Sequence, residues 1–425
     1  MNALYERKNS IDYLKVINIK TMSDNPISRR KFVSNTVLTL GGLMVAKAPL
    51  FGKTISLGET VQIGVIGTGK RGLGLINTMG KVPGLKIVAC CDIIPENLSA
   101  AMAKAEPNAK AYTDYEKLLA DRNVDAVVIA TPLYLHYPMA VAALSVDKHV
   151  YVEKSMAFTI EQALDLVKRV RDSKLVFQVG FQYRNFELYH KIKEVINEGW
   201  IGDTYSFECQ YNRNSDWRYP VKDPKLEKII NWRMYKDLCG GPLSELCAHQ
   251  IDAVNFITDS HPTKVIGLGG IDYWKDGRET HDNVRTVYEY ENGAKATYTS
   301  VLSNAFNGYQ IRILGNKATI EIERNKAFIY SEATKRTLGT VDGVTGATIL
   351  NATQGEKTEI PYLEAGEKSV EPTISALKDF LDCIVNNKKP ASNEETGRDS
   401  AIAICMGLDA MDTEKMQHWK PEYSL

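Results

Sequence analysis

The sequence lacks the marks of several protein classes. Its 425 residues carry no excess charge, since 52 Lys and Arg balance 52 Asp and Glu, and no block rich in Lys and Arg stands out. Duplex nucleic acid, which requires a basic surface, is therefore not an expected partner. The seven cysteines form no C-x-x-C pair, so we expect buried thiols at Cys90 and Cys91 and no metal site.

The composition indicates a globular protein with two domains. Hydrophobic residues make up 44% and charged residues 24% of the chain, which excludes extensive disorder, collagen repeats and a polytopic membrane protein. A domain usually has roughly 100–200 residues. We expect a targeting and linker segment over residues 1–57, a nucleotide-binding domain over 58–180 and a second domain over 181–425.

The N-terminal segment contains an arginine pair, Arg29 and Arg30, in the string S-R-R-K-F-V. A glycine-containing apolar stretch follows over residues 37–45, too short for a membrane-spanning helix of about 20 residues. This pattern is typical of a twin-arginine (Tat) export signal and predicts a periplasmic protein. Two alternatives stay open: a disordered terminus on a cytoplasmic protein, and a start at Met22. Pro49 disfavours cleavage at the adjacent A-K-A site.

Residues 61–72 predict a dinucleotide site. The apolar run Val61–Ile66 fits a buried strand, and the G-x-G-x-x-G turn Gly67, Thr68, Gly69, Lys70, Arg71 and Gly72 leads from it into a helix. The first glycine permits the tight turn, the second lets a pyrophosphate approach the backbone, and the third allows close packing of helix and strand. The helix N-terminus then faces the anion.

Asp92 ends the next apolar strand, twenty positions after Gly72. A carboxylate there accepts hydrogen bonds from the adenosine ribose and repels a 2′-phosphate. The following residue is the apolar Ile93. The sequence therefore favours NAD over NADP.

Strands and helices alternate up to about residue 181, which predicts a doubly wound parallel sheet, the Rossmann form of an α/β fold. Ligands bind at the carboxyl ends of such strands. The residues expected there, near the cofactor, are Thr131, Pro132, His136, Glu153 and Lys154. We interpret His136 mainly as helix N-terminal structure.

The second half predicts an α+β domain with a mostly antiparallel, open sheet. Strand patterns near residues 205–211, 264–270, 283–291, 294–302, 310–314 and 318–322 are separated by turn signals. A helix over about 241–257 carries Glu245 and His249, whose spacing of four places them on one face. Two C-terminal helices, about 371–386 and 396–411, are expected to pack back onto the body, and 335–370 is expected to be loop-rich.

An ordered set of motifs resembles the Gfo/Idh/MocA oxidoreductases over residues 61 to about 411. The set is G-T-G-K-R-G with Asp92, T-P-L-Y-L-H from 131, E-K at 153–154, G-F-Q-Y-R at 180–184, G-G-P-L-S-E-L-C-A-H-Q-I-D at 240–252 and H-D-N-V-R-T-V-Y-E-Y at 281–290. The resemblance implies a nicotinamide cofactor, hydride transfer at a sugar or cyclitol carbinol, and a homo-oligomer, a dimer or tetramer.

The resemblance also implies catalytic residues. Lys154 matches the lysine of the family's E-K-P motif, which contacts the reacting hydroxyl, and His249 matches its acid/base histidine. Histidine suits proton transfer near neutral pH, and an ammonium stabilises alkoxide charge. The chain departs from the family twice. Ser155 replaces the proline for which a cis bond is cheap, and Glu245 replaces a shorter aspartate, as a third catalytic and substrate-binding candidate.

Four further residues are candidates for contact with the sugar, each with a structural alternative. Tyr183 and Arg184 follow the last strand of the first domain and could instead anchor the domain junction. Trp232 and Arg233 precede the helix of His249, and core packing is their alternative role.

Three functions follow. The first is an exported NAD-dependent sugar oxidoreductase whose cofactor either exchanges or stays tightly bound. The second is a glycoside hydrolase or lyase that oxidises the sugar transiently with bound NAD, although the helix lacks the Y-P-T-H string of that branch. The third is a non-catalytic sugar or nucleotide sensor, which the presence of Lys154 and His249 disfavours.

Overall fold

The computed structural model describes residues 60–332, 338–341, 344–349, 354–364 and 366–424. The predicted export signal and the predicted boundary at residue 57 lie outside the described residues. Within those ranges, no helix is both long and apolar enough to cross a membrane.

The N-terminal sheet has six parallel strands in the spatial order β3-β2-β1-β4-β5-β6. They are β1 (Val61–Ile66), β2 (Leu85–Cys91), β3 (Lys110–Tyr112), β4 (Ala126–Ile129), β5 (His149–Val152) and β6 (Phe177–Val179). This order is that of a dinucleotide-binding Rossmann sheet, in which the ligand crevice lies at the carboxyl ends of β1 and β4, where the strand order reverses. The predicted doubly wound sheet is confirmed. The short β3 was not predicted.

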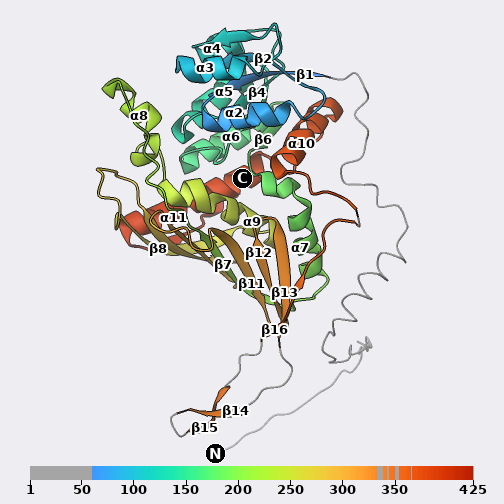
Figure 1. Cartoon of the computed structure of the whole chain (residues 1–425), viewed down its shortest axis with the longest axis vertical. Coiled ribbons are helices and arrows are strands. Elements are labelled where there is room, and N and C mark those ends of the chain that lie inside the picture. The colour runs from blue at the N-terminus through green and yellow to red at the C-terminus, as the bar shows by residue number, and fades with distance from the viewer. Residues whose placement is uncertain (1–59, 333–337, 342–343, 350–353, 365, 425) are drawn as a thin grey trace, which may run out of the picture. The chain divides into compact units, whose positions relative to one another are not determined.

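Helices connect these strands (Figure 1). They are α2 (Lys70–Met79), α3 (Pro95–Met102), α4 (Tyr115–Leu119), α5 (His136–Ser145) and α6 (Ile160–Asp172). The helix α6 shows why the sequence specifies it. Thr159 accepts a hydrogen bond from the Gln162 N–H and so caps the helix, and the apolar face Ala163, Leu166, Val167 and Val170 is buried at helical spacing.

The second sheet has nine strands in the order β16-β13-β12-β11-β7-β10-β9-β8-β17. They are β7 (Thr204–Tyr211), β8 (Pro262–Gly270), β9 (Asn283–Tyr290), β10 (Lys295–Val301), β11 (Tyr309–Gly315), β12 (Ala318–Glu323), β13 (Lys326–Glu332), β16 (Gln354–Glu359) and β17 (Gln417–His418). All neighbours pair antiparallel except β7 with β10. The predicted, mostly antiparallel sheet is confirmed.

The second half contains elements that the sequence did not predict. The region 335–370 is not only loop, because β16 and the hairpin of β14 (Leu338–Val341) and β15 (Val344–Ile349) lie within it. The helices α7 (Glu187–Asn197) and α8 (Glu227–Ile230) were missed. For α7 a signal existed, because its buried residues Leu188, Tyr189, Ile192 and Val195 recur at helical spacing.

The two C-terminal helices pack back onto both sheets. Leu377, Phe380 and Leu381 of α10 (Pro372–Asn386) lie in one hydrophobic core with Val61 and Ile63 of the first strand. The helix α11 (Glu394–Thr413) packs against α6, α9 (Ala248–Thr258) and β8 (Figure 1). The end of the chain therefore completes the N-terminal core. The domain boundary near residue 180 stays a prediction.

Candidate active site

The glycine turn between β1 and α2 has the shape of a dinucleotide cradle. Gly67 has φ of +84°, and a Cβ there would lie 2.8 Å from Thr131 Cγ2. A Cβ on Gly72 would lie 1.9 Å from the Gly67 carbonyl oxygen, so no side chain fits at either position. Gly69 precedes the first turn of α2 without a side-chain cap. The N–H groups of that turn are therefore available to an anion.

Asp92, just beyond β2, is fixed in place by its neighbours. Its carboxylate accepts hydrogen bonds from the Thr68 N–H at 2.8 Å and hydroxyl at 3.2 Å, from the Ile94 N–H at 2.8 Å and from Asn97 at 3.4 Å. The carboxylate is thus preoriented beside the glycine turn, where ribose hydroxyls are recognised in Rossmann domains. The role of Asn97 has no signature in the sequence.

The carboxyl ends of β4 and β5 are joined by His136. One ring nitrogen lies 2.7 Å from the Ser155 carbonyl oxygen and the other 3.0 Å from that of Thr131. The ring is buried at 2% exposure, and burial lowers its pKa. His136 therefore links the two strand ends.

Two features at the ends of β4 and β5 fit a bound dinucleotide. One is a buried hydroxyl without a described partner, and the other is an ion pair that joins the glycine turn to β5. The Thr131 hydroxyl oxygen is buried and has no hydrogen-bond partner among the described residues, and Pro132 follows it at the start of the turn Leu133–Leu135. Arg71 of the glycine turn pairs with the buried carboxylate of Glu153 at 2.7 Å. Lys70 and Arg71 are both exposed.

Lys154 lies at the centre of a partly buried charge cluster. Its ammonium donates to the Glu245 carbonyl oxygen at 3.2 Å and to Glu245 Oε1 at 3.4 Å. Arg233 Nε donates to the other carboxylate oxygen, Oε2, at 2.7 Å. Burial alone would raise the pKa of Glu245, but Lys154 and Arg233 overcome this effect and lower it to about 2. The Lys154–Ser155 peptide is cis although Ser155 replaces the family's proline.

His249 lies near this cluster in an aromatic wall. Its ring is 5.5 Å from that of Tyr183 and 6.2 Å from that of Phe181, measured between centroids. Its Nδ1 is buried and has no hydrogen-bond partner within the described ranges. Burial, then the positive charges of Lys154 and Arg71, lower the pKa of His249 well below its ordinary value. The imidazole is therefore neutral at pH 7 and can accept a proton.

The backbone around Glu245 differs from the expected single helix. Residues Leu243–Cys247 form a π-helical turn, and the α-helix α9 begins only at Ala248. A π turn has a wider hydrogen-bond spacing and often occurs at functional sites. The expected α-helical geometry between Glu245 and His249 was therefore wrong. The longer side chain of Glu245 contacts Lys154 and Arg233.

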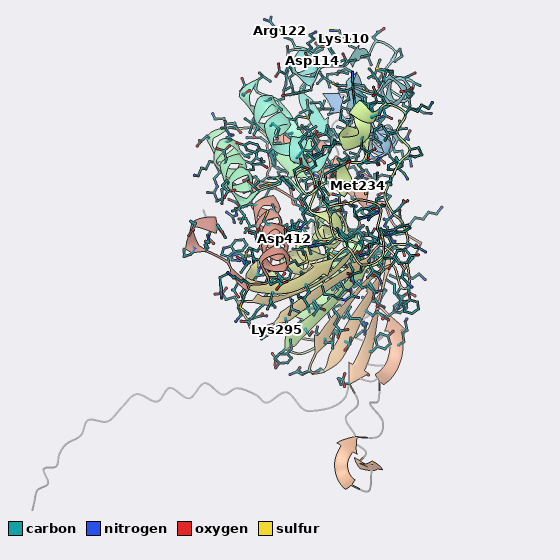
Figure 2. The ribbon with its side chains drawn as sticks, turned by 90° about the vertical axis from the view of Figure 1, so that its left-hand side faces the viewer. Lys110, Asp114, Arg122, Met234, Lys295 and Asp412 are labelled. Atoms are coloured by element: carbon teal, nitrogen blue, oxygen red, sulfur yellow. The ribbon has the colours of Figure 1, made fainter. Side chains whose placement is uncertain are left out.

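The structure brings three of the four remaining sugar-contact candidates to this cluster. Arg233 covers the ring of Trp232, with its guanidinium carbon 4.2 Å from the ring centroid, and Tyr183 contacts His249. The next residue, Met234, marks the place of this segment in Figure 2. Arg184 lies elsewhere. Its buried guanidinium pairs with both oxygens of Asp252 at 2.9 and 3.0 Å, the contacts of a junction anchor.

Comparison with known proteins agrees with this geometry. The NAD-binding Rossmann fold of the GFO_IDH_MocA oxidoreductase family matches residues 61–181, and the GFO/IDH/MocA C-terminal domain matches 189–321. The oxidoreductase YrbE of Bacillus subtilis is 26% identical over 84% of this chain and 99% of its own. Inositol 2-dehydrogenase of Salmonella typhimurium is 33% identical over 40% of this chain and 52% of its own.

The solved structures add a likeness of fold. Levoglucosan dehydrogenase in complex with NADH and levoglucosan superposes with a TM-score of 0.69 at 20% identity, over 85% of this chain and 100% of that chain. The two matched family models together span more than half of the sequence, in the family's order. This chain therefore belongs to the Gfo/Idh/MocA family and is an NAD-dependent oxidoreductase.

Proposed function

We propose that the protein transfers hydride between NAD and a secondary hydroxyl of a sugar, glycoside or cyclitol. The observation that carries the proposal is the placement of a largely buried Lys154 side chain and a neutral His249 imidazole in one cluster. The similarity to inositol 2-dehydrogenase and levoglucosan dehydrogenase supports this substrate class.

In this proposal each residue of the cluster has a separate task. Bound NAD supplies the hydride acceptor. His249 accepts the hydroxyl proton, because the low pKa of its imidazole keeps it neutral. The Lys154 ammonium stabilises the developing alkoxide charge. Glu245, held by Arg233, positions that ammonium.

Nucleotide analysis of the purified, denatured protein tests this proposal first. We expect released NAD in stoichiometric amount if the cofactor is tightly bound, or NADH formation from added NAD and a sugar or cyclitol if it exchanges. The proposal would be contradicted if the protein released no NAD and also formed no NADH with any member of a panel of aldoses, anhydrosugars and inositols.

Asp92→Ala is expected to weaken NAD binding about 10- to 100-fold, because two charge-assisted hydrogen bonds to the ribose would be lost. Since the carboxylate also repels a 2′-phosphate, the variant should bind NADP no worse than the unmodified protein. Calorimetric titration of nucleotide-free protein measures both dissociation constants. Asp172→Ala, an exposed change at the end of α6, is the control. An unchanged NAD dissociation constant in Asp92→Ala would remove Asp92 from the cofactor site.

The hydrolase interpretation is not favoured over the dehydrogenase. It predicts release of an aglycone without net NADH formation, and the same assays distinguish the two. A non-catalytic sensor would bind nucleotide and sugar without either reaction.

We further propose that the chain is exported through the twin-arginine route to the periplasm. Arg29 and Arg30, followed by the glycine-containing apolar stretch, support this. Replacing both arginines with lysine should keep the protein in the cytoplasmic fraction. Equal distribution of both forms between the cell fractions would contradict export.

We also propose a homo-oligomer formed through the open face of the second sheet. Ile266 and Leu268 of β8 are 47% and 70% exposed, and Val287 of β9, the register partner of Ile266, is 41% exposed. Neighbouring exposed apolar side chains mark interaction surfaces. Light scattering should give a mass of at least two chains. A mass of one chain at micromolar concentration would contradict this.

A further inference from the structure

Two arginines converge on one tyrosine hydroxyl beside the candidate active site. Arg213, just after β7, donates to Tyr211 Oη at 3.0 Å, and Arg324, between β12 and β13, donates to it at 3.5 Å. Their guanidinium carbons lie 5.4 and 5.8 Å from the centroid of the Tyr211 ring. Segments far apart in the sequence thus bring two positive charges to one point.

A chain of aromatic rings joins this pair to His249. The Tyr183 ring, 5.5 Å from His249, is 5.7 Å from that of Tyr309, which is 5.2 Å from Tyr211. Arg324 also lies 5.7 Å from the Tyr309 centroid. The positive charge of Arg324 contributes to the low pKa of His249. Arg324 therefore belongs to the surroundings of the proposed acid/base, and the shared Tyr211 hydroxyl holds Arg213 next to it.

Among the described residues, Arg213 and Arg324 have no carboxylate partner, unlike the other arginines of the site. Arg71 pairs with Glu153, and Arg233 pairs with Glu245. Arg213 and Arg324 are exposed, and within the described part of the chain the Tyr211 hydroxyl is the only hydrogen-bond partner of their guanidinium groups.

The backbone conformation at position 324 does not explain why an arginine occupies it. It has φ of +51° in the turn between β12 and β13, a left-handed conformation that turns normally assign to Gly, Asn or Asp. Its backbone position thus favours another residue type, whereas its side chain supplies a guanidinium to the Tyr211 hydroxyl.

We propose that the sugar substrate carries an anionic group, a carboxylate or a phosphate, which Arg213 and Arg324 bind while the reacting hydroxyl lies between Lys154 and His249. Guanidinium groups match the oxygens of carboxylate and phosphate in bidentate geometry. The Tyr211 hydroxyl holds both donors together, next to the ring of Tyr309. This inference rests on the proposed function and adds a substrate class to it, the acidic sugars.

The test is calorimetric binding to the NAD-loaded protein. Glucuronate and galacturonate probe the carboxylate, glucose 6-phosphate probes the phosphate, and glucose and galactose are the neutral counterparts. We expect one class of acid to bind about 10- to 100-fold more tightly than its neutral counterpart, as charge-assisted hydrogen bonds provide. The double variant Arg213→Gln/Arg324→Gln should reduce this ratio to about one. Arg122→Gln should keep the ratio, because Arg122 is exposed and lies far from Met234 in Figure 2.

The outcomes separate this inference from the proposed function. Equal binding of every acid and its neutral counterpart, or an unchanged ratio in the double variant, would overturn the anion site, even if neutral sugars are oxidised. A preference for acids that the double variant removes supports the anion site, even if no NADH forms. A lower melting temperature with an unchanged ratio would show that the arginines only pack on the tyrosines.

Discussion

Lys154→Met is expected to lower kcat for substrate oxidation about 100- to 10,000-fold, the range found when a charge-stabilising or proton-transferring group is removed. Methionine keeps the length and packing of the side chain and removes only the ammonium that lies beside Glu245. NAD binding should persist, because the glycine turn and Asp92 are unchanged. Stopped-flow and steady-state measurements of NADH formation give kcat, and calorimetry gives the NAD dissociation constant.

A second variant separates catalysis from stability. In Lys154→Met the buried Glu245 keeps only Arg233, so its pKa rises from about 2 and the fold loses stability. Adding Glu245→Gln removes the buried charge and should restore much of the melting temperature without restoring kcat. Lys295→Met, at an exposed site on β10, is the control. Substantial activity in the double variant would mean that Lys154 acts only as a structural partner of Glu245.

His249→Asn is expected to lower kcat/KM for oxidation about 100- to 10,000-fold, because the variant lacks the imidazole that accepts the hydroxyl proton. His418→Asn, on an exposed histidine, should retain full activity. Normal kcat/KM in His249→Asn would exclude the imidazole as the base and would leave the role of Lys154 open.

The pH dependence of the unmodified protein provides a separate check on His249. Burial and nearby positive charges lower the pKa of its imidazole, so the base stays deprotonated as the pH falls below the ordinary histidine value of about 6.5. The acidic limb of kcat/KM should therefore lie below pH 6.5. Glu245 raises the pKa of His249, so Glu245→Gln should move that limb to still lower pH. A limb above pH 6.5, or a shift upward in Glu245→Gln, would contradict the assignment.

The parts of the fold that the sequence predicts are those governed by local periodicity. The strand Val61–Ile66, the glycine turn and α2 follow from neighbouring residues alone. The strand β16, within 335–370, does not follow from neighbouring residues. Pairing with β13, rather than local composition, makes it a strand. The helix α7 was overlooked although its apolar spacing is regular.

For the candidate site, residue types were predictable but contacts were not. Lys154 and Glu245 stood out as motif positions, yet their contact depends on the π turn, for which the sequence carries no recognised signal. The convergence of Arg213 and Arg324 on Tyr211 requires the strand order of the second sheet. No spacing along the chain encodes that order.

Because α10 packs against the first strand, folding of the N-terminal core has to wait for the C-terminal part of the chain. Val61 leaves the ribosome long before Leu377 and Phe380, which share its core. Until those residues emerge, the apolar surface that they cover is exposed to water, a condition that favours aggregation or chaperone binding. The core of the nucleotide domain is therefore complete only when nearly the whole chain has been translated. Translation that stops before residue 372 would yield a product without α10, with this apolar surface uncovered.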